Sequence, residues 1–333
     1  MRENSEKRRV CVIAACYNEE AVIELFYERL SGVLQTLPDY RFEILLVDDG
    51  SSDRTLAILN ELHAKDPQLS LISLSRNFGH QVALTAGLDA VDADAAIIMD
   101  CDLQHPPELI PELIRRWEAG AEIVSTIRVA TEKTSLLKSI ISVCFYWIIN
   151  LLSDTRITPN SADFCLLSSK ALNAMQQMPE RHRFMRGMIA WMGFQRDFVE
   201  FKAPARAAGE SKYSWRKMIG LGWTAIYSFS AKPLRIAVRF GVLLAALGMF
   251  YLIFVLWAAI FRPEKVIPGW ASVIGVLLIM SGVQLVFTGL IGEYVARLYE
   301  EAKQRPLYFL KQSKRARTFD GSPTQAGSDS RKL

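Results

Sequence analysis

The sequence predicts an α/β fold with a mostly parallel sheet, followed by a C-terminal hairpin of two transmembrane helices. Between residues 9 and 127, short apolar runs alternate with amphipathic stretches across short connections. This alternation is typical of parallel strands that helices cover on both faces. Between residues 240 and 292, two long apolar stretches carry no charge outside the short link that separates them, and each is long enough to span a bilayer.

The composition narrows the classes of protein that fit. The 333 residues suffice for one good-sized domain and an appendage, and half of them are hydrophobic. A net charge of +4 is too small to argue for nucleic acid, and no nucleic-acid-binding motif is present. The five cysteines show no C-x-x-C pair and no zinc spacing, so we expect buried thiols in a reducing compartment. The polar N-terminus lacks the features of a signal peptide, which places the N-terminal domain in the cytosol.

The elements of the α/β part follow from hydrophobic periodicity. Asp53 suits the N-cap of the second helix, and Pro106 suits the start of the fourth, where a missing N–H costs nothing. The expected strands are 9–14, 42–47, 69–74, 95–99 and 123–127. The expected helices are 21–37, from Asp53 to about Ala64, 81–90 and 106–120.

Polar segments follow four successive strands of this predicted sheet. The carboxyl ends of parallel strands share one edge, which is where open α/β sheets bind ligands. Turn and capping chemistry explains each segment alone, but all four at one edge favour a nucleotide site. Asp100 and Asp102 offer oxygen ligands to a hard divalent cation, Mg²⁺ or Mn²⁺, and such a cation suits a diphosphate. The segments are 15–20, 48–53, 75–80 and 100–107.

These segments resemble the family 2 glycosyltransferases of GT-A fold. Within them the chain resembles the polyprenyl-phosphate glycosyltransferases: dolichol-phosphate mannose synthase and, more closely, the bacterial bactoprenol (undecaprenyl-phosphate) glucosyltransferases. The resemblance extends through 161–164, 181–184, 206–213 and 229–235 to about residue 312. In one departure, Ala15 and Cys16 precede Tyr17, where the family often has proline two residues before the tyrosine. The Q-x-x-R-W motif of the processive synthases is not found in the sequence.

The resemblance implies roles for particular residues. Asp100, Asp102 and Gln104 would hold the metal and the diphosphate. The implied catalytic residues are Asp102, Asp163 and Arg128. Asp163 would be the acceptor-side carboxylate that orients the acceptor. The alternative for Asp163 is the N-cap of a helix. His105 is either a ligand or a helix-entry residue, and the second is favoured. The residues implied to bind the donor nucleotide are Ala15, Tyr17, Glu19, Val47, Asp49, Asp100 and Cys101.

The implied reaction displaces a nucleoside diphosphate from the sugar, with inversion, by a polyprenyl phosphate. A phosphate monoester has a second pKa of about 6 and is already an anionic nucleophile at neutral pH, so no strong general base is required. The site needs cations that hold this phosphate beside the diphosphate. The candidates for the acceptor phosphate are Arg128, Lys133, Arg206 and Lys212.

The membrane segments follow from hydropathy and charge. Stretches 136–152 and 213–229 suit helices at the lipid interface, although a buried core helix is an alternative for the first. Residues 240–261 and 266–292 are the expected spans, and 299–333 are the expected basic cytosolic tail, disordered from Thr318. Basic residues flank the hairpin on both sides, so the positive-inside bias places both termini in the cytosol. We therefore expect a multi-pass protein of a bacterial inner membrane, and the resemblance implies a homo-oligomer, a tetramer.

The sequence leaves the sugar open. The resemblance favours UDP-glucose as donor, and GDP-mannose and UDP-4-deoxy-4-formamido-arabinose are alternatives that share the same motifs. A non-catalytic membrane scaffold would not need an intact Asp-x-Asp pair. A transporter is disfavoured because the two spans contain no ionisable residue, and Gln284 is their one polar side chain of note.

Overall fold

A mixed eight-stranded sheet, in the order β7-β5-β6-β4-β1-β2-β3-β8, forms the centre of the domain. The computed structural model describes residues 7–129, 158–202, 230, 232–261 and 269–316. Strands β1 to β4 run parallel, as the sequence predicts, and β7 is parallel to β5. Strand β6 is antiparallel to both of its neighbours and β8 is antiparallel to β3, and the other strands share one direction, so the sheet is mostly parallel, as expected.

All five predicted strands and four predicted helices are present within a few residues of their expected bounds. The strands are β1 Arg8–Cys16, β2 Tyr40–Asp48, β3 Leu69–Leu74, β4 Ala95–Asp100, β5 Ile123–Val129, β6 Ser161–Ser168, β7 Arg196–Lys202 and β8 Leu310–Lys314. The helices are α1 Ile23–Gln35, α2 Thr55–Lys65, α3 His80–Asp89, the 3-10 turn η1 Pro107–Leu109, α4 Ile110–Glu118, α6 Ser169–Gln176, α7 Met185–Trp191, α9 Lys232–Phe261 and α10 Trp270–Ala302.

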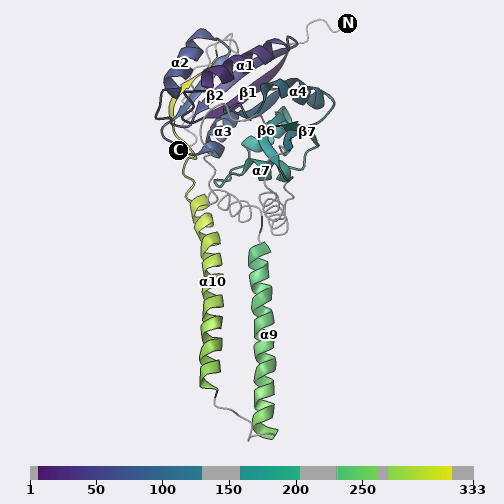
Figure 1. Ribbon diagram of the computed structural model, residues 1–333, viewed down its shortest axis with the longest axis vertical. Helices are drawn as coiled ribbons and strands as arrows, with labels where there is room; N and C mark the ends of the chain where they lie inside the picture. Colours follow the sequence, from purple (N-terminus) through teal and green to yellow (C-terminus); the bar gives the residue numbers. More distant parts are fainter. Residues whose placement is uncertain (1–6, 130–157, 203–229, 231, 262–268, 317–333) are drawn as a thin grey trace.

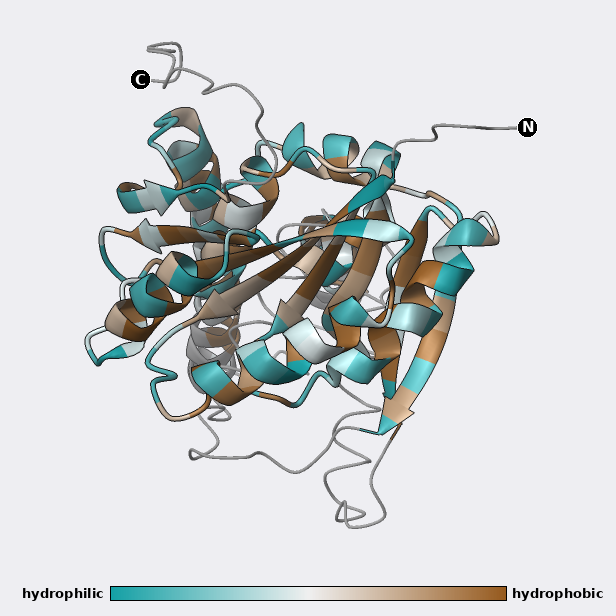
Figure 2. Cartoon of the chain, turned by 90° about the horizontal axis from the view of Figure 1, so that it is seen from above, coloured by the Kyte–Doolittle hydropathy of each residue, from teal (hydrophilic) through white to brown (hydrophobic). Residues whose placement is uncertain are grey.

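Two apolar layers hold helices against the two faces of the sheet. Alternate residues of β1 divide between them: Val12 joins the layer that contains α1, α2 and α4, and Ile13 joins the layer under α3, α6 and α7. Helix α3 lies close to β1, since a Cβ at Gly87 would come within 2.4 Å of the Ile13 side chain. Figure 2 shows the brown strands at the centre and the teal helix surfaces outside them.

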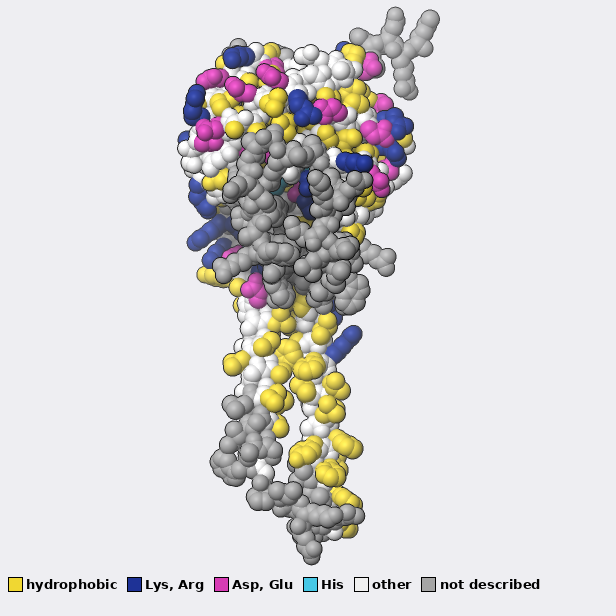
Figure 3. Space-filling view, in the orientation of Figure 1, with side chains coloured by type: hydrophobic (Ala, Val, Ile, Leu, Met, Phe, Trp, Pro, Cys, Tyr) yellow, Lys and Arg dark blue, Asp and Glu magenta, His cyan; other side chains and the backbone are white. Residues whose placement is uncertain are grey.

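Helices α9 and α10 leave the domain side by side as a long hairpin (Figure 1). Within the described residues, these two helices are long and apolar enough to cross a membrane, and their most apolar windows are 6% and 0% buried. Hydrophobic side chains therefore cover the hairpin, whereas charges gather on the domain (Figure 3). Near the domain the Tyr294 hydroxyl donates to the Ser230 carbonyl at 2.8 Å, and the rings of Phe240 and Phe287 meet at 6.0 Å.

The chain returns to the sheet after the hairpin, which the sequence does not predict. Helix α10 continues to Ala302, and β8 then pairs with the edge strand β3. The Ser75 N–H donates to the Phe309 carbonyl at 2.8 Å, and the Ala316 N–H donates to the Ser70 hydroxyl at 2.8 Å. Part of the expected tail is thus a strand of the domain's central sheet.

Several predicted features lie outside the described residues. They are the interfacial stretches 136–152 and 213–229, the link 262–265, the tail from Thr318, Cys144, and the cations Lys133, Arg206 and Lys212. The four described cysteines are buried, as expected. Helix α2 begins two residues after Asp53, whose carboxylate accepts from the Thr55 N–H at 2.9 Å.

Candidate functional site

The loops that follow β2 and β3 are joined by two buried carboxylates. Asp49 accepts the backbone N–H groups of Phe78 at 2.8 Å and Gly79 at 3.0 Å. Asp48 accepts the Ser73 hydroxyl at 2.7 Å. Burial raises the pKa of the Asp49 carboxyl, although the two N–H donors act in the opposite direction. The loop 75–79 is therefore fixed against the end of β2.

The loop that follows β1 is tied to the loop that follows β2. Asn18, in the left-handed region at φ 53°, donates its N–H to the Ser51 hydroxyl at 3.0 Å, and its side-chain oxygen accepts the Ser52 N–H at 2.9 Å. Asparagine tolerates this backbone conformation better than most residues. Beside it, Tyr17 leaves 37% of its surface exposed at the rim. Glu19 is partly buried, and its N–H donates to the Thr55 hydroxyl at 2.9 Å.

Three predicted nucleotide-binding residues have buried side chains. Val47 is 0% exposed, Cys101 is 2% exposed and Ala15 is 7% exposed. The Cys101 thiol donates to the Ala15 carbonyl at 3.2 Å across neighbouring strands. Contact with a nucleotide at Val47 and Cys101 would therefore involve the backbone, and their assignment stays a prediction.

The Asp-x-Asp pair lies in a tight turn at the end of β4. The Asp100 N–H donates to Nδ1 of His105 at 2.9 Å, and the Asp102 carboxylate accepts the Gln104 N–H at 3.0 Å. Leu103 lies between them at φ 61°, a left-handed conformation that costs a branched residue strain, and its side chain is buried. His105 is 3% exposed and stacks on Phe164 at 5.3 Å, which agrees with a packed helix-entry residue.

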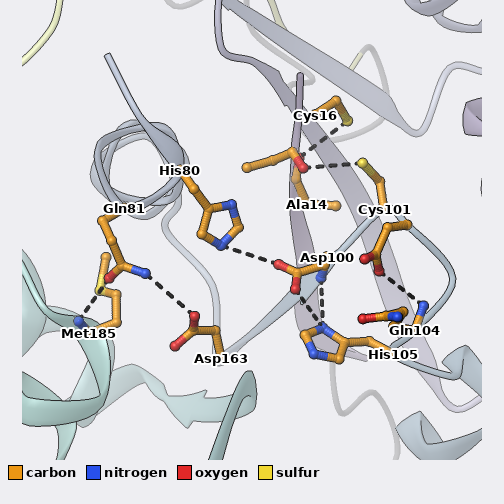
Figure 4. A network of polar contacts seen from close by, with 12 residues as sticks. Ala14, Cys16, His80, Gln81, Asp100, Cys101, Gln104, His105, Asp163 and Met185 are labelled. Carbon is orange, nitrogen blue, oxygen red and sulfur yellow. Dashed lines mark hydrogen bonds and ion pairs between the residues drawn. The ribbon is translucent and has the colours of Figure 1, made fainter. Parts of the chain in front are cut away.

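Asp100 lies between two histidines (Figure 4). Nε2 of His80 is 3.2 Å from Oδ1, and Nδ1 of His105 is 3.5 Å from Oδ2. Burial acts to raise the pKa of Asp100, but His105 and His80 outweigh it and hold this pKa well below its usual range. Burial acts to lower the pKa of His80, but Asp100 raises it to about 9. The sequence motif contains His80, but its contact with Asp100 was not predicted.

The donor set at this turn fits a divalent cation in part. Asp100 and Asp102 bring carboxylate oxygens to one turn, where Oδ1 of Asp100 already faces Nε2 of His80 at 3.2 Å. Among the described residues, no cluster of three or more His, Cys, Asp and Glu could hold a metal by itself. Mg²⁺ is commonly held by one or two carboxylates together with water and substrate phosphates, and that arrangement agrees with these residues.

Arg128 lies beside this turn, at the end of β5. Its Nη2 donates to the side-chain oxygen of Gln104 at 3.3 Å. The residue is exposed, and β5 is separated from β4 by β6 in the sheet. The structure therefore brings together three predicted elements of the site: the Asp-x-Asp turn, Gln104 and one predicted acceptor cation.

Asp163 belongs to strand β6, so the alternative that it caps a helix is wrong. Its carboxylate is paired with Arg186 of α7, with Nε to Oδ1 at 2.8 Å and Nη2 to Oδ2 at 3.2 Å. Both residues line a cavity of about 210 Å³, whose wall also includes His80. Sequence reasoning missed Arg186, although the motif 181–184 ends two residues before it.

Comparison with known proteins is consistent with this architecture. The model of glycosyl transferase family 2 matches residues 11–175, and that of the GtrB C-terminal hairpin matches residues 232–298. The uncharacterized glycosyltransferase YkcC of Bacillus subtilis is 40% identical over 91% of this chain and 93% of its own length. The chain belongs to glycosyl transferase family 2. It is therefore a glycosyltransferase, and its hairpin is the C-terminal element that the second model describes.

Further relatives share nearly the full length. The SfII prophage-derived bactoprenol glucosyl transferase of Shigella flexneri is 37% identical over 92% of this chain and 99% of its own. Among solved structures, glucosyl-3-phosphoglycerate synthase from Mycobacterium tuberculosis, in complex with Mn²⁺, UDP-glucose and phosphoglyceric acid, has a TM-score of 0.44. It is 15% identical and covers 66% of this chain and 78% of that one.

Proposed function

We propose that this glycosyltransferase transfers glucose from UDP-glucose to undecaprenyl phosphate, with inversion, at the cytosolic face of a bacterial inner membrane. The observation that carries the proposal is the full-length similarity to a bactoprenol glucosyl transferase, which includes both the catalytic domain and the hairpin. The product is a polyprenyl-phosphate sugar, which supplies cell-envelope glycan modification.

The donor binds at the shared edge of β1, β2 and β4. Tyr17 and the loops fixed by Asp49 contact the base and ribose, and Asp100, Asp102 and Gln104 hold the diphosphate and a divalent cation. When bound, the cation stabilises the negative charge of the leaving diphosphate. The turn around Leu103 supports this role because a hydrogen bond from the Asp100 N–H and one to the Asp102 carboxylate fix its shape.

The acceptor phosphate approaches from the side of Arg128. Two unit charges 4 Å apart repel by about 4 kcal/mol at an effective dielectric constant near 20, so cations must offset this repulsion between the phosphates. Arg128 is suited because it already contacts Gln104 beside the Asp-x-Asp turn. Lys133, Arg206 and Lys212 complete the cationic set, and Asp163 orients the acceptor.

The hairpin holds this site at the bilayer surface, where the acceptor's head group lies. Helices α9 and α10 both cross the membrane, with the catalytic domain and both termini in the cytosol. The basic residues that flank the hairpin support this orientation. The family resemblance supports a homo-oligomer, a tetramer, as the assembled form.

A donor panel tests the proposed reaction. Membranes that contain the protein are incubated with undecaprenyl phosphate and radiolabelled UDP-glucose, GDP-mannose or UDP-4-deoxy-4-formamido-arabinose. We expect label in the organic-extractable lipid with UDP-glucose and loss of the signal in excess chelator. Transfer from another donor alone would replace glucose in the proposal, and no transfer from any donor would contradict it.

Asp102→Asn is expected to lower turnover about 100-fold or more while the protein still folds and inserts. The amide preserves the shape of the side chain but removes the charge that holds the cation. A bound cation contributes several kcal/mol to the stabilisation of the transition state. Turnover is measured with saturating UDP-glucose and undecaprenyl phosphate. Asp92→Asn is the matched control, because the Asp92 side chain is 97% exposed. Full activity of Asp102→Asn would remove the Asp-x-Asp pair from the mechanism.

A further inference from the structure

The Asp163 carboxylate is held from two sides. Besides the two contacts from Arg186, the side-chain amide nitrogen of Gln81 lies 3.4 Å from Oδ2. The Asp163 side chain is 11% exposed and that of Arg186 is 25% exposed. A guanidinium that donates to both oxygens fixes the plane of a carboxylate more strictly than a single contact does.

The two residues that hold Asp163 are linked through the backbone of Met185. The Gln81 side-chain oxygen accepts the Met185 N–H at 2.9 Å, and Met185 immediately precedes Arg186 at the start of α7. Gln81 belongs to the first turn of α3. The beginnings of α3 and α7 therefore meet above β6, and the carboxylate of Asp163 points into the junction (Figure 4).

The same turn of α3 reaches the Asp-x-Asp pair. His80, the residue before Gln81, places Nε2 3.2 Å from Asp100. His80 and Gln81 are consecutive residues, and they contact Asp100 and Asp163 respectively. The proposed function gives these two carboxylates separate roles. The cavity of about 210 Å³ lies at this place, with Phe78 and Phe184 among its walls and Arg186 and Asp163 as its charged pair.

We propose that Gln81 and Arg186 are positioning residues that set the direction of the Asp163 carboxylate for sugar transfer. The proposal rests on the proposed function, since it assigns the acceptor-side role to Asp163. The charge on Arg186 is compensated by Asp163, so this arginine is a poor site for a phosphate dianion. Instead, the two hydrogen bonds from Arg186 set the orientation of the Asp163 carboxylate. Gln81 fixes the same carboxylate relative to α3.

The test is a double-mutant cycle on turnover. Arg186→Met and Gln81→Leu should each lower kcat about tenfold to a hundredfold, because small misplacements of a catalytic group are costly, with the KM of both substrates little changed. Arg186→Lys, which keeps the charge, should recover part of the loss. In an Asp163→Asn background the same substitutions should cause no further loss, because they act through Asp163.

Several outcomes would overturn the proposal. One is that Arg186→Met and Gln81→Leu lower kcat by the same factor in the wild-type and Asp163→Asn backgrounds. Another is a raised KM for undecaprenyl phosphate at unchanged kcat, which would make Arg186 a direct acceptor ligand. If Asp163→Asn has no measurable turnover, the single variants decide: an unchanged kcat in Arg186→Met overturns the proposal, and a reduced kcat that Arg186→Lys partly recovers supports it.

Controls separate positioning from folding and from the reaction itself. Arg116→Met removes another arginine that is paired with carboxylates, Glu112 at 2.7 Å and Asp197 at 2.9 Å. Arg116 does not line the cavity, and its replacement should leave kcat unchanged. Melting temperature and membrane-inserted amount are measured for every variant, and rates are normalised to protein that binds UDP. An inactive wild type would refute the proposed function, whereas an active wild type with additive losses would refute only the positioning role.

Discussion

At the scale of single residues, the site depends on close approaches between loops more than on the acidic residues alone. Asp49 fixes the loop that follows β3 by accepting two of its N–H groups, and Asn18 ties the loop that follows β1 to the loop that follows β2. Gly50, in the loop that follows β2, has φ 66°, and a Cβ there would come within 2.3 Å of the Arg76 backbone in the loop that follows β3. Only glycine at this position allows the loops that follow β2 and β3 to lie this close together.

Gly50→Ala is therefore expected to lower the free energy of unfolding by about 1–3 kcal/mol, from backbone strain and forced separation of the loops. It should also weaken UDP binding, because Asp49 would move with the loop. Thermal unfolding in detergent and UDP titration measure the two effects. Gly32→Ala in α1 is the control, because nothing lies within 4 Å of its Cβ position. Equal behaviour of the two variants would show that the loops tolerate separation.

At the scale of elements, hydrophobic patterning predicts strands β1 to β5, the helices between them and the two long helices of the hairpin, but not β6, β7 or β8. Strand β3 matches its predicted range because all of its residues are buried. Strand β8 has the sequence LKQSK and is largely exposed, so it has no apolar pattern to detect, and its strand conformation depends on pairing with the β3 edge. Arg186 escaped prediction for a similar reason, since its role depends on β6 and α7 meeting in space.

The last turn of α10 and the chain after it bind the domain at several points. Glu301 accepts the Arg181 N–H at 2.8 Å, Tyr308 donates to Asp89 at 3.2 Å, and Gln312 donates to Asn60 at 2.7 Å. These contacts connect α10 to α2, to α3 and to the segment before α7. Helix α3 also carries His80 and Gln81, so the chain after the hairpin and the candidate site are connected to the same helix.

A chain that ends at residue 309 should be less stable and more prone to aggregate than the full chain, because it exposes the unpaired edge of β3. A chain that ends at residue 316 keeps β8 and should match the full-length protein. Size-exclusion chromatography and thermal unfolding in the same detergent compare the three proteins. If the chain ending at 309 remains monodisperse with an unchanged melting temperature, β8 contributes nothing to the sheet.

At the scale of the whole molecule, the hairpin leaves the domain and returns to it. Helix α9 begins just after Ser230, the Tyr294 hydroxyl of α10 donates to the Ser230 carbonyl, and β8 rejoins the sheet. The helices contain 30 and 33 residues, which corresponds to about 45 and 50 Å. Both lengths exceed a hydrocarbon core of about 30 Å, so each helix is long enough to cross one.

This geometry makes the proposed topology testable with few substitutions. If α9 and α10 both cross the bilayer, the link 262–265 faces outward and the end of the chain stays with the domain. The four described native cysteines are 1–2% exposed, so an impermeant thiol reagent should not reach them, and only Cys144 needs replacement by serine. In intact cells, a cysteine at Pro263 should then be labelled, and one at Thr318 should be labelled only after lysis. Labelling of Thr318→Cys in intact cells, with Pro263→Cys protected, would place the catalytic domain outside, away from cytosolic nucleotide sugars.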